Sequence, residues 1–217
     1  MFVPRIFGVP RSGSTVIYNI VDYLYGGTVL PQKHDYFEDC AMLYKTIATY
    51  RDFRDSCTSQ WRAYHAGFDE EKDRRQIPRG DLIAHARNQI ITVEHLNRLK
   101  VDAEQGRNIL FLRYEDFFDN DIGDLNFDFI FKSLQTFLDI EITEDQRGYI
   151  KQNFSFKSQK KFSKQYKDFH EYDEKRHIHG HHLYKGKTGT WRELVPEEYH
   201  GMLNDILRSS LLEWGYE

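Results

Sequence analysis

The stretch that decides the fold stands at the start of the sequence, where residues 1–20 read MFVPRIFGVPRSGSTVIYNI. Residues 2–7 form a short apolar run that ends at Gly8 and Pro10, which predicts a buried strand followed by a turn. From Ser14 to Leu24 the apolar residues recur at helical spacing, and two glycines then stop the run. The order strand, glycine-containing loop, helix is the context in which a backbone can cradle a phosphate group.

The loop between strand and helix, GVPRSGST at residues 8–15, has the Gly-x4-Gly spacing and closing Ser/Thr of a phosphate-binding P-loop. Ser14, however, stands where such a loop places its lysine. The backbone N–H groups of Ser12, Gly13, Ser14 and Thr15, with the positive end of the following helix, can hold an anion. Arg11 can supply the missing side-chain charge. The loop therefore predicts a site for a phosphate-like ligand that needs no such lysine.

The rest of the chain continues the alternation of strands and helices. Strands are predicted at residues 28–30, 42–50 and 108–114, the last buried on both faces of a sheet. Helices are predicted at 55–66, from a cap at Asp81 to about Gly106, at 125–138, after a capping box of Thr143 and Gln146, and from Pro196 onward. We expect one α/β domain over residues 1–217, with three α/β/α layers and a mostly parallel central sheet like that of P-loop nucleotide hydrolases. Ligands of such sheets gather at the carboxyl ends of the strands.

Composition narrows the function. The chain has 217 residues and a formal net charge of -4, which argues against a nucleic-acid or membrane-surface binder. Its two cysteines, Cys40 and Cys57, lack metal-like spacing and suit a reducing compartment. The start shows neither a secretory signal nor a membrane anchor. We therefore expect a cytoplasmic protein whose anion site is local.

Three further stretches could serve an anionic ligand. Arg51 follows a predicted strand, and Ser59 stands eight residues later in the next helix, so that the two could hold a phosphate together. Taken alone, Arg51 is more typical of a surface ion pair with Asp52 or Asp55. Tyr114 closes the predicted strand in LFLRYEDF, residues 110–117, and YKGKTGTWRE, residues 184–193, is a basic glycine-containing loop.

Together and in this order, the four stretches resemble the sulfotransferase family that uses 3′-phosphoadenosine 5′-phosphosulfate (PAPS) and releases 3′-phosphoadenosine 5′-phosphate (PAP). The resemblance implies that residues 11–15 hold the phosphosulfate and that Arg51 and Ser59 hold the 3′-phosphate. It places Tyr114 near adenine, and Lys185 and Gly186 on the 3′-phosphate. No metal is implied.

The resemblance is greater to some members of the family than to others, and the sequence differs from the family pattern at two positions. The wording PRSGST looks more like members that act on carbohydrates, tyrosine residues or bacterial metabolites than like the cytosolic phenol and steroid enzymes. Those enzymes have Arg-Lys-Gly and then Gly-Asp-Trp near the C-terminus, where this chain has Tyr184 in place of the Arg and Thr190 in place of the Asp.

Sulfuryl transfer needs a cation for the leaving phosphate and a base for the acceptor's proton. Arg11, the loop amides and Lys33 can stabilise the leaving group. His34, in VLPQKHDYFED, is the predicted base because its ordinary pKa suits proton transfer near neutral pH. Asp35 and Glu38 are the substitutes.

A histidine-rich segment spans residues 170–182. With the basic residues 157–167 it is predicted to form a lid, in which His170 and Tyr172 face the acceptor, rather than a dedicated metal site.

Two other functions stay open: a P-loop kinase for a small molecule, and a non-catalytic nucleotide-binding module. The expected partner is a small-molecule or carbohydrate acceptor with a hydroxyl or amine, with no nucleic acid or membrane. The sequence leaves a homodimer open.

Overall fold

The computed structural model describes residues 3–31, 34, 45–65, 76–180, 183 and 185–216. At its centre lies a parallel sheet of β1 (Arg5–Gly8), β2 (Thr46–Tyr50) and β3 (Ile109–Arg113), in the order β1-β2-β3. β2 is the middle strand, with its Thr49 opposite Gly8 and its Tyr50 opposite Arg113. The parallel register therefore brings the three carboxyl ends to one edge of the sheet.

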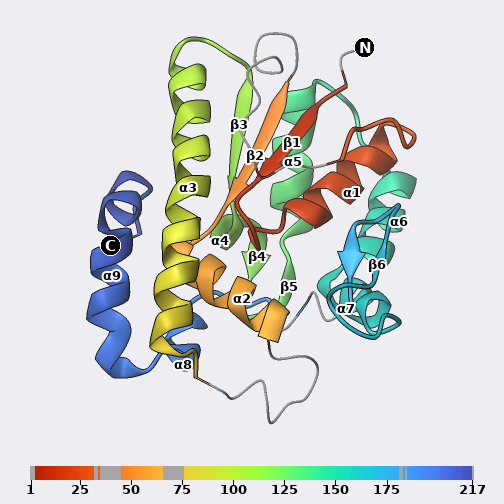
Figure 1. Cartoon of the computed structure of the whole chain (residues 1–217). Helices are drawn as coiled ribbons and strands as arrows, with labels where there is room; N and C mark the ends of the chain where they lie inside the picture. The colour runs from red at the N-terminus through yellow and green to blue at the C-terminus, as the bar shows by residue number, and fades with distance from the viewer. Residues whose placement is uncertain are drawn as a thin grey trace.

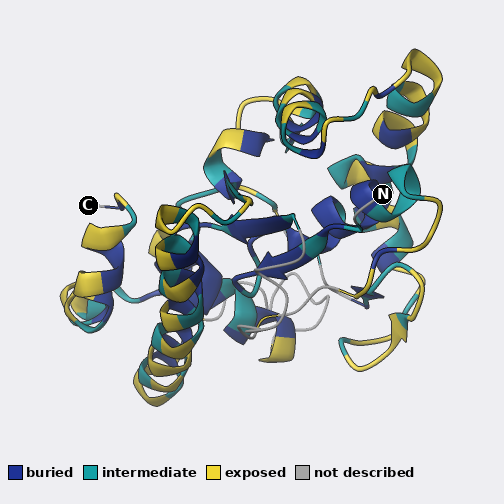
Figure 2. Ribbon diagram, turned by 90° about the horizontal axis from the view of Figure 1, so that it is seen from above, coloured by how far each residue is buried: buried dark blue, intermediate teal, exposed yellow. Residues whose placement is uncertain are grey.

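Helices cover both faces of the sheet, because successive side chains of a strand point to opposite faces. Ile6 and Ile47 enter one hydrophobic cluster, and Phe7 and Ala48 enter the other. The first cluster is completed by α1 (Ser14–Leu24), α5 (Phe127–Leu138) and α6 (Glu144–Phe154), and the second by α2 (Phe53–His65), α3 (Arg79–Glu104) and α9 (His200–Glu213). Figures 1 and 2 show these two helical layers on either side of the strands. The predicted three-layer α/β/α fold with a parallel central sheet is confirmed.

The remaining elements are short, and most of them lie beyond the carboxyl ends of the strands, in the lower half of Figure 1. They are α4 (Tyr114–Phe117), β4 (Phe118–Asp119), β5 (Asp124–Leu125), α7 (Phe156–Ser163), β6 (Tyr172–Asp173), β7 (Ile178–His179), α8 (Trp191–Leu194) and the 3-10 turn η2 (Glu197–Tyr199). The antiparallel pairs β4-β5 and β6-β7 form two small hairpins.

Local signals located most elements well. The capping box at the start of α6 is present: the Gln146 amide donates to Thr143 Oγ1 at 3.3 Å, and the Thr143 amide donates to Gln146 Oε1 at 3.0 Å. The predicted strand at 28–30 is wrong. There the Val29 amide donates to the Asp22 carboxylate at 3.0 Å, so the segment folds back on α1 instead of joining the sheet.

Other boundaries differ by a few residues. β3 is partly buried along most of its length rather than buried on both faces. Tyr114 begins α4 instead of closing β3. α3 begins at Arg79, with Asp81 accepting from Trp61 Nε1 at 3.0 Å rather than capping the helix. Pro196 precedes η2, and α9 starts only at His200. Residues 42–44 of the strand predicted at 42–50 lie outside the described residues.

Candidate functional site

The loop after β1 has the backbone of an anion cradle. Gly13 is the N-cap of α1 with φ of 80°, a left-handed conformation that glycine adopts at little cost. A Cβ there would lie 2.9 Å from the ring of Phe117. Arg11 adopts φ of 68° without being glycine, a conformation that side chains disfavour and that often marks functional sites. Gly13 therefore sets the N-terminus of α1, the end at which the backbone N–H groups of a helix point outward, at this loop.

The residues of this loop have different structural roles. Ser12 is fully buried, its amide donates to Val9 O at 3.1 Å, and its hydroxyl contacts Thr49 Oγ1 at 2.6 Å. The hydroxyl of Ser12 therefore holds the loop against β2, and its amide closes a turn within the loop. Gly13, Ser14 and Thr15 line cavities instead.

Arg51 follows β2 directly and is buried at 5% exposure. Its guanidinium pairs with Asp55 at 3.3 Å and donates to the carbonyls of Arg11 and Lys187, at 3.2 Å each. It also lies 4.4 Å from the centroid of the Tyr114 ring. Arg51 therefore forms an ion pair with Asp55, but the pair is buried and not on the surface. Asp52 pairs with Arg54 instead, at 2.7 Å.

Asp55 ties α2 to the C-terminal loop. Its fully buried carboxylate accepts from the Gly189 amide at 2.6 Å and from the Trp191 amide at 2.8 Å, besides its pair with Arg51. Burial of an ionised carboxylate is costly unless it is paired and hydrogen-bonded, and here it is both. One side chain therefore fixes the Arg51 turn against the start of α8.

Tyr114 joins the third strand end to the same loop. Its hydroxyl donates to Gly186 O at 2.7 Å, and its ring stacks on Phe118 with centroids 5.3 Å apart. Gly186 has φ of 73°, and a Cβ there would lie 2.5 Å from Phe118. The close approach of this backbone to aromatic rings explains the glycine. Burial raises the pKa of Tyr114, so its hydroxyl keeps its proton.

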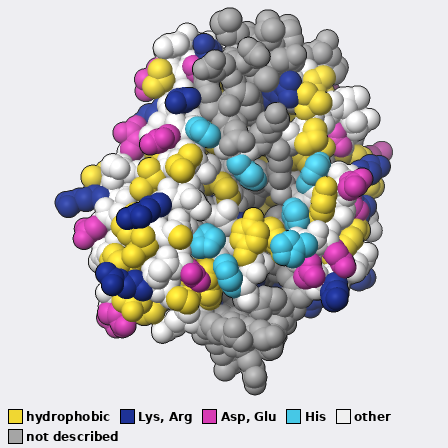
Figure 3. All heavy atoms as spheres, in the orientation of Figure 1, with side chains coloured by type: hydrophobic (Ala, Val, Ile, Leu, Met, Phe, Trp, Pro, Cys, Tyr) yellow, Lys and Arg dark blue, Asp and Glu magenta, His cyan; other side chains and the backbone are white. Residues whose placement is uncertain are grey.

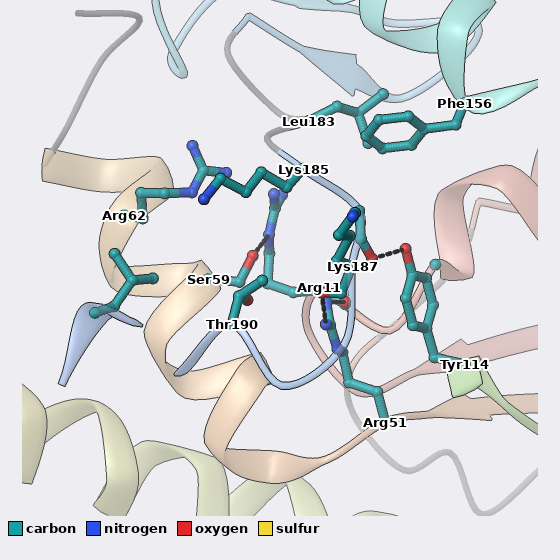
Figure 4. A pocket seen from close by; sticks show the side chains of 13 residues that line it. Arg11, Arg51, Ser59, Arg62, Tyr114, Phe156, Leu183, Lys185, Lys187 and Thr190 are labelled. Atoms are coloured by element: carbon teal, nitrogen blue, oxygen red, sulfur yellow. Dashed lines mark hydrogen bonds between the residues drawn. The ribbon is translucent and has the colours of Figure 1, made fainter. Parts of the chain in front are cut away.

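These stretches converge on one pocket of about 70 Å³, which we call the arginine pocket (Figure 4). It is lined by Arg11, Gly13, Arg51, Ser59, Arg62, Tyr114, Phe156, Leu183, Lys185, Gly186, Lys187, Thr190 and Leu194. Seven of the predicted site residues are among them. Of the lining residues that the structure describes, five are cationic and none is acidic.

The electrostatics of the arginine pocket favour an anion. Burial lowers the pKa of Arg11 to about 9, and the like charges of Arg62 and Arg51 add to this effect. Burial acts most strongly to lower the pKa of Arg51, but Asp55 and the other acidic groups around it together outweigh burial, and the pKa is raised. Clustered guanidinium groups repel one another, so a bound anion would stabilise them together.

An apolar recess of about 60 Å³ adjoins this pocket and shares Gly13, Tyr114, Phe156 and Leu183 with it. Val16, Leu125, Phe154 and Ile178 complete most of its wall. Rings and branched side chains of this kind suit a flat apolar group.

A second cavity, of about 320 Å³, lies on the other side of the loop. It is lined by Pro10, Arg11, Gly13, Ser14, Thr15, His34, Gln60, Ala63, Tyr64, Phe169, His177 and His179, and we call it the histidine cavity. Figure 3 shows histidine side chains gathered near the middle of one face of the molecule. Arg11 and Gly13 line both the arginine pocket and the histidine cavity, so the two meet at the loop.

His34 is held in a defined tautomer. Its Nδ1 contacts the carbonyl oxygen of Gly8, and because a carbonyl can only accept, Nδ1 carries the proton. The other nitrogen, Nε2, is then the basic one. Lys33, Asp35 and Glu38 lie outside the described residues.

The histidine-rich segment forms the β6-β7 hairpin, which packs on α1. Asn19 Nδ2 donates to Arg176 O at 2.9 Å, and the ring of His177 meets Tyr18 edge-on at 5.0 Å. Burial lowers the pKa of His177 and of His179. Among the described residues, these two line the histidine cavity, whereas the predicted His170 and Tyr172 do not.

The described residues show neither a metal-binding cluster nor a membrane-spanning helix. They contain no cluster of His, Cys, Asp or Glu that could hold a metal ion, and His181 and His182 fall outside them. No helix among them has the length and apolarity that crossing a membrane requires.

Cys57 is a buried free thiol whose pKa burial raises to about 12, while Cys40 lies outside the described residues.

Sequence reasoning missed Arg62 and underrated Asp55. Arg62 lines the arginine pocket at 4% exposure, one helical turn after Ser59. The spacing of three residues from Ser59 was a usable signal, because residues i and i+3 share a helix face.

Comparisons with known proteins agree with this geometry. The chain is similar in structure to the mouse sulfotransferase SULT7A1 complexed with PAP, with a TM-score of 0.67 and 14% identity over 97% of this chain and 84% of that one. It is also similar to retinol dehydratase in complex with androsterone and the inactive cofactor PAP, with a TM-score of 0.64 and 16% identity over 96% of this chain and 80% of that one. No curated protein matches the sequence. The sequence pattern of the sulfotransferase domain matches residues 40–215, which is most of the chain. The protein therefore belongs to the sulfotransferase domain family.

Proposed function

We propose that the protein transfers a sulfuryl group from PAPS to a hydroxyl or amine of a small-molecule or carbohydrate acceptor. The observation that carries the proposal is the meeting of two cavities at Arg11 and Gly13. One of them is lined by five cations, and the other contains a histidine with a basic Nε2. A donor with phosphate groups fits the first, and an acceptor that must lose a proton fits the second.

The residues of the arginine pocket suit the donor. Gly13 lines this pocket and lacks the Cβ that would clash with Phe117, and Arg11 lies two residues earlier in the same loop. Arg51 donates to two neutral carbonyls, and a phosphate in their place would make stronger, charge-assisted hydrogen bonds. The apolar recess beside Tyr114 suits adenine. Ser14, Thr15, Ser59, Lys185 and Gly186 complete the proposed donor site, and Ser12 supports the loop.

The donor supplies a sulfuryl group bound to a phosphate oxygen. His34 Nε2 takes the proton of the acceptor as the acceptor atom bonds to sulfur, and Arg11 stabilises the charge that remains on the departing phosphate. The loop residues and the helix N-terminus hold the phosphate in place. None of these roles requires a metal ion.

The proposal is tested with sulfur-35 PAPS and a panel of phenols, amines, alcohols and sugars, with and without a chelator. We expect label to move to one acceptor class at a rate that the chelator does not change. Phosphorylation of the same panel by ATP with magnesium, without sulfuryl transfer, would identify a kinase instead. Binding of PAP with no transfer to any acceptor would identify a nucleotide-binding module.

A further inference from the structure

We propose that Arg62 is an additional binding residue for the 3′-phosphate of the donor. The inference rests on the proposed function and adds a residue to the donor site. Arg62 lies on α2, and its side chain points into the arginine pocket, as do Ser59 from the same helix and Lys185 from the C-terminal loop (Figure 4).

The geometry of α2 places Arg62 with Ser59. Residues three apart share a helix face, and Ser59 and Arg62 both line the arginine pocket. Gln60, Ala63 and Tyr64 line the histidine cavity instead. α2 therefore separates the two cavities, and Arg62 is on the donor side of that division.

Charge supports the same assignment. Arg62 is buried at 4% exposure, so its guanidinium is shielded from water. Among the charges that lower the pKa of Arg11, that of Arg62 is the largest. A phosphate between Ser59 and Lys185 would offset the repulsion between the guanidinium groups of Arg62 and Arg11.

The test compares Arg62→Met, which keeps the apolar stem and loses the charge, with Arg62→Lys, which keeps a charge. PAP binding is measured by calorimetry, and AMP binding, which lacks only the 3′-phosphate, by ligand-observed NMR. We expect Arg62→Met to weaken PAP about 10- to 100-fold, as the loss of one charge-assisted hydrogen bond implies, with little effect on AMP. Arg62→Lys should keep most of the affinity.

Arg208→Met, at an exposed position of α9, is the matched control and should bind PAP like the wild type. Unchanged PAP binding by Arg62→Met overturns the inference, and so does an equal loss for PAP and AMP. If Arg62→Lys loses as much affinity for both ligands as Arg62→Met, the role is packing, which also overturns it. Failure of the wild type to bind PAP would instead contradict the proposed function.

Discussion

Arg11 is the residue at which the two cavities meet, and its backbone is held in a left-handed conformation. That conformation costs about 1 to 3 kcal/mol for a residue other than glycine. The fold sustains it through the Ser12 contacts with β2 and the Arg51 bond to the Arg11 carbonyl. In this conformation the guanidinium of Arg11 lies beside the N-terminus of α1. It supplies the positive charge that an ordinary P-loop takes from a lysine, at the position that Ser14 occupies here.

The lowered pKa of Arg11 predicts a pH dependence of donor binding. A cation whose pKa is about 9 loses its charge as pH rises through that value, so the affinity for PAP should fall there. Each phosphate of PAP stays doubly charged over this range, since the second pKa of a phosphate monoester is about 6. Calorimetric titrations between about pH 7.5 and about pH 10 measure the fall. An Arg11→Gln variant should bind more weakly and lose this fall, and an unchanged slope in the variant would assign the fall to another group.

His34 is predicted to act in the chemical step and not in donor binding. His34→Ala should lower kcat by about 100-fold or more, because no group then takes the acceptor's proton. Its affinity for PAP should stay near that of the wild type, which calorimetry checks in parallel. Turnover equal to the wild type would move the role of base to Asp35 or Glu38.

At the scale of elements, α2 connects the pieces of the site. It begins two residues after Arg51, carries Asp55, Ser59 and Arg62, and presents Tyr64 to the other cavity. Asp55 extends this connection to Gly189 and Trp191, more than a hundred residues away in sequence. The helix therefore sets the distance between the arginine pocket and the histidine cavity.

Asp55→Asn tests this connection. The variant leaves Arg51 buried without its carboxylate, which should lower the free energy of unfolding by about 3 kcal/mol. Urea denaturation followed by circular dichroism measures the change, and Asp205→Asn at an exposed position of α9 is the control. Amide hydrogen exchange in residues 185–191 should also become faster. Exchange at the wild-type rate would mean that other contacts hold the loop.

Local sequence signals predicted most helices and strands. The features that the sequence did not predict depend on contacts between residues that are not adjacent in the chain. The loop at 8–15 and the capping box of α6 depend on residues close in sequence, so their patterns were sufficient. Residues 28–30 have strand-like composition, but the Asp22 carboxylate binds the Val29 amide, which a pattern of apolar residues does not reveal. Arg62 was missed because its meaning depends on which face of α2 meets the C-terminal loop.

At the scale of the whole molecule, one edge of the sheet explains the site. The carboxyl ends of β1, β2 and β3 lead into Arg11, Arg51 and Tyr114, and the chain returns through residues 185–190 to the same place. The family membership, the fold and the cationic pocket agree on a sulfotransferase. The choice of donor is the central claim that follows from this arrangement.

Calorimetric titration of the wild type with PAP, compared with ATP in the presence of magnesium, tests that claim most directly. We expect PAP to bind without a metal and ATP with magnesium not to displace it, because the loop lacks the lysine that a triphosphate needs. Tight binding of ATP with magnesium and no binding of PAP would contradict the assignment of PAPS as the donor.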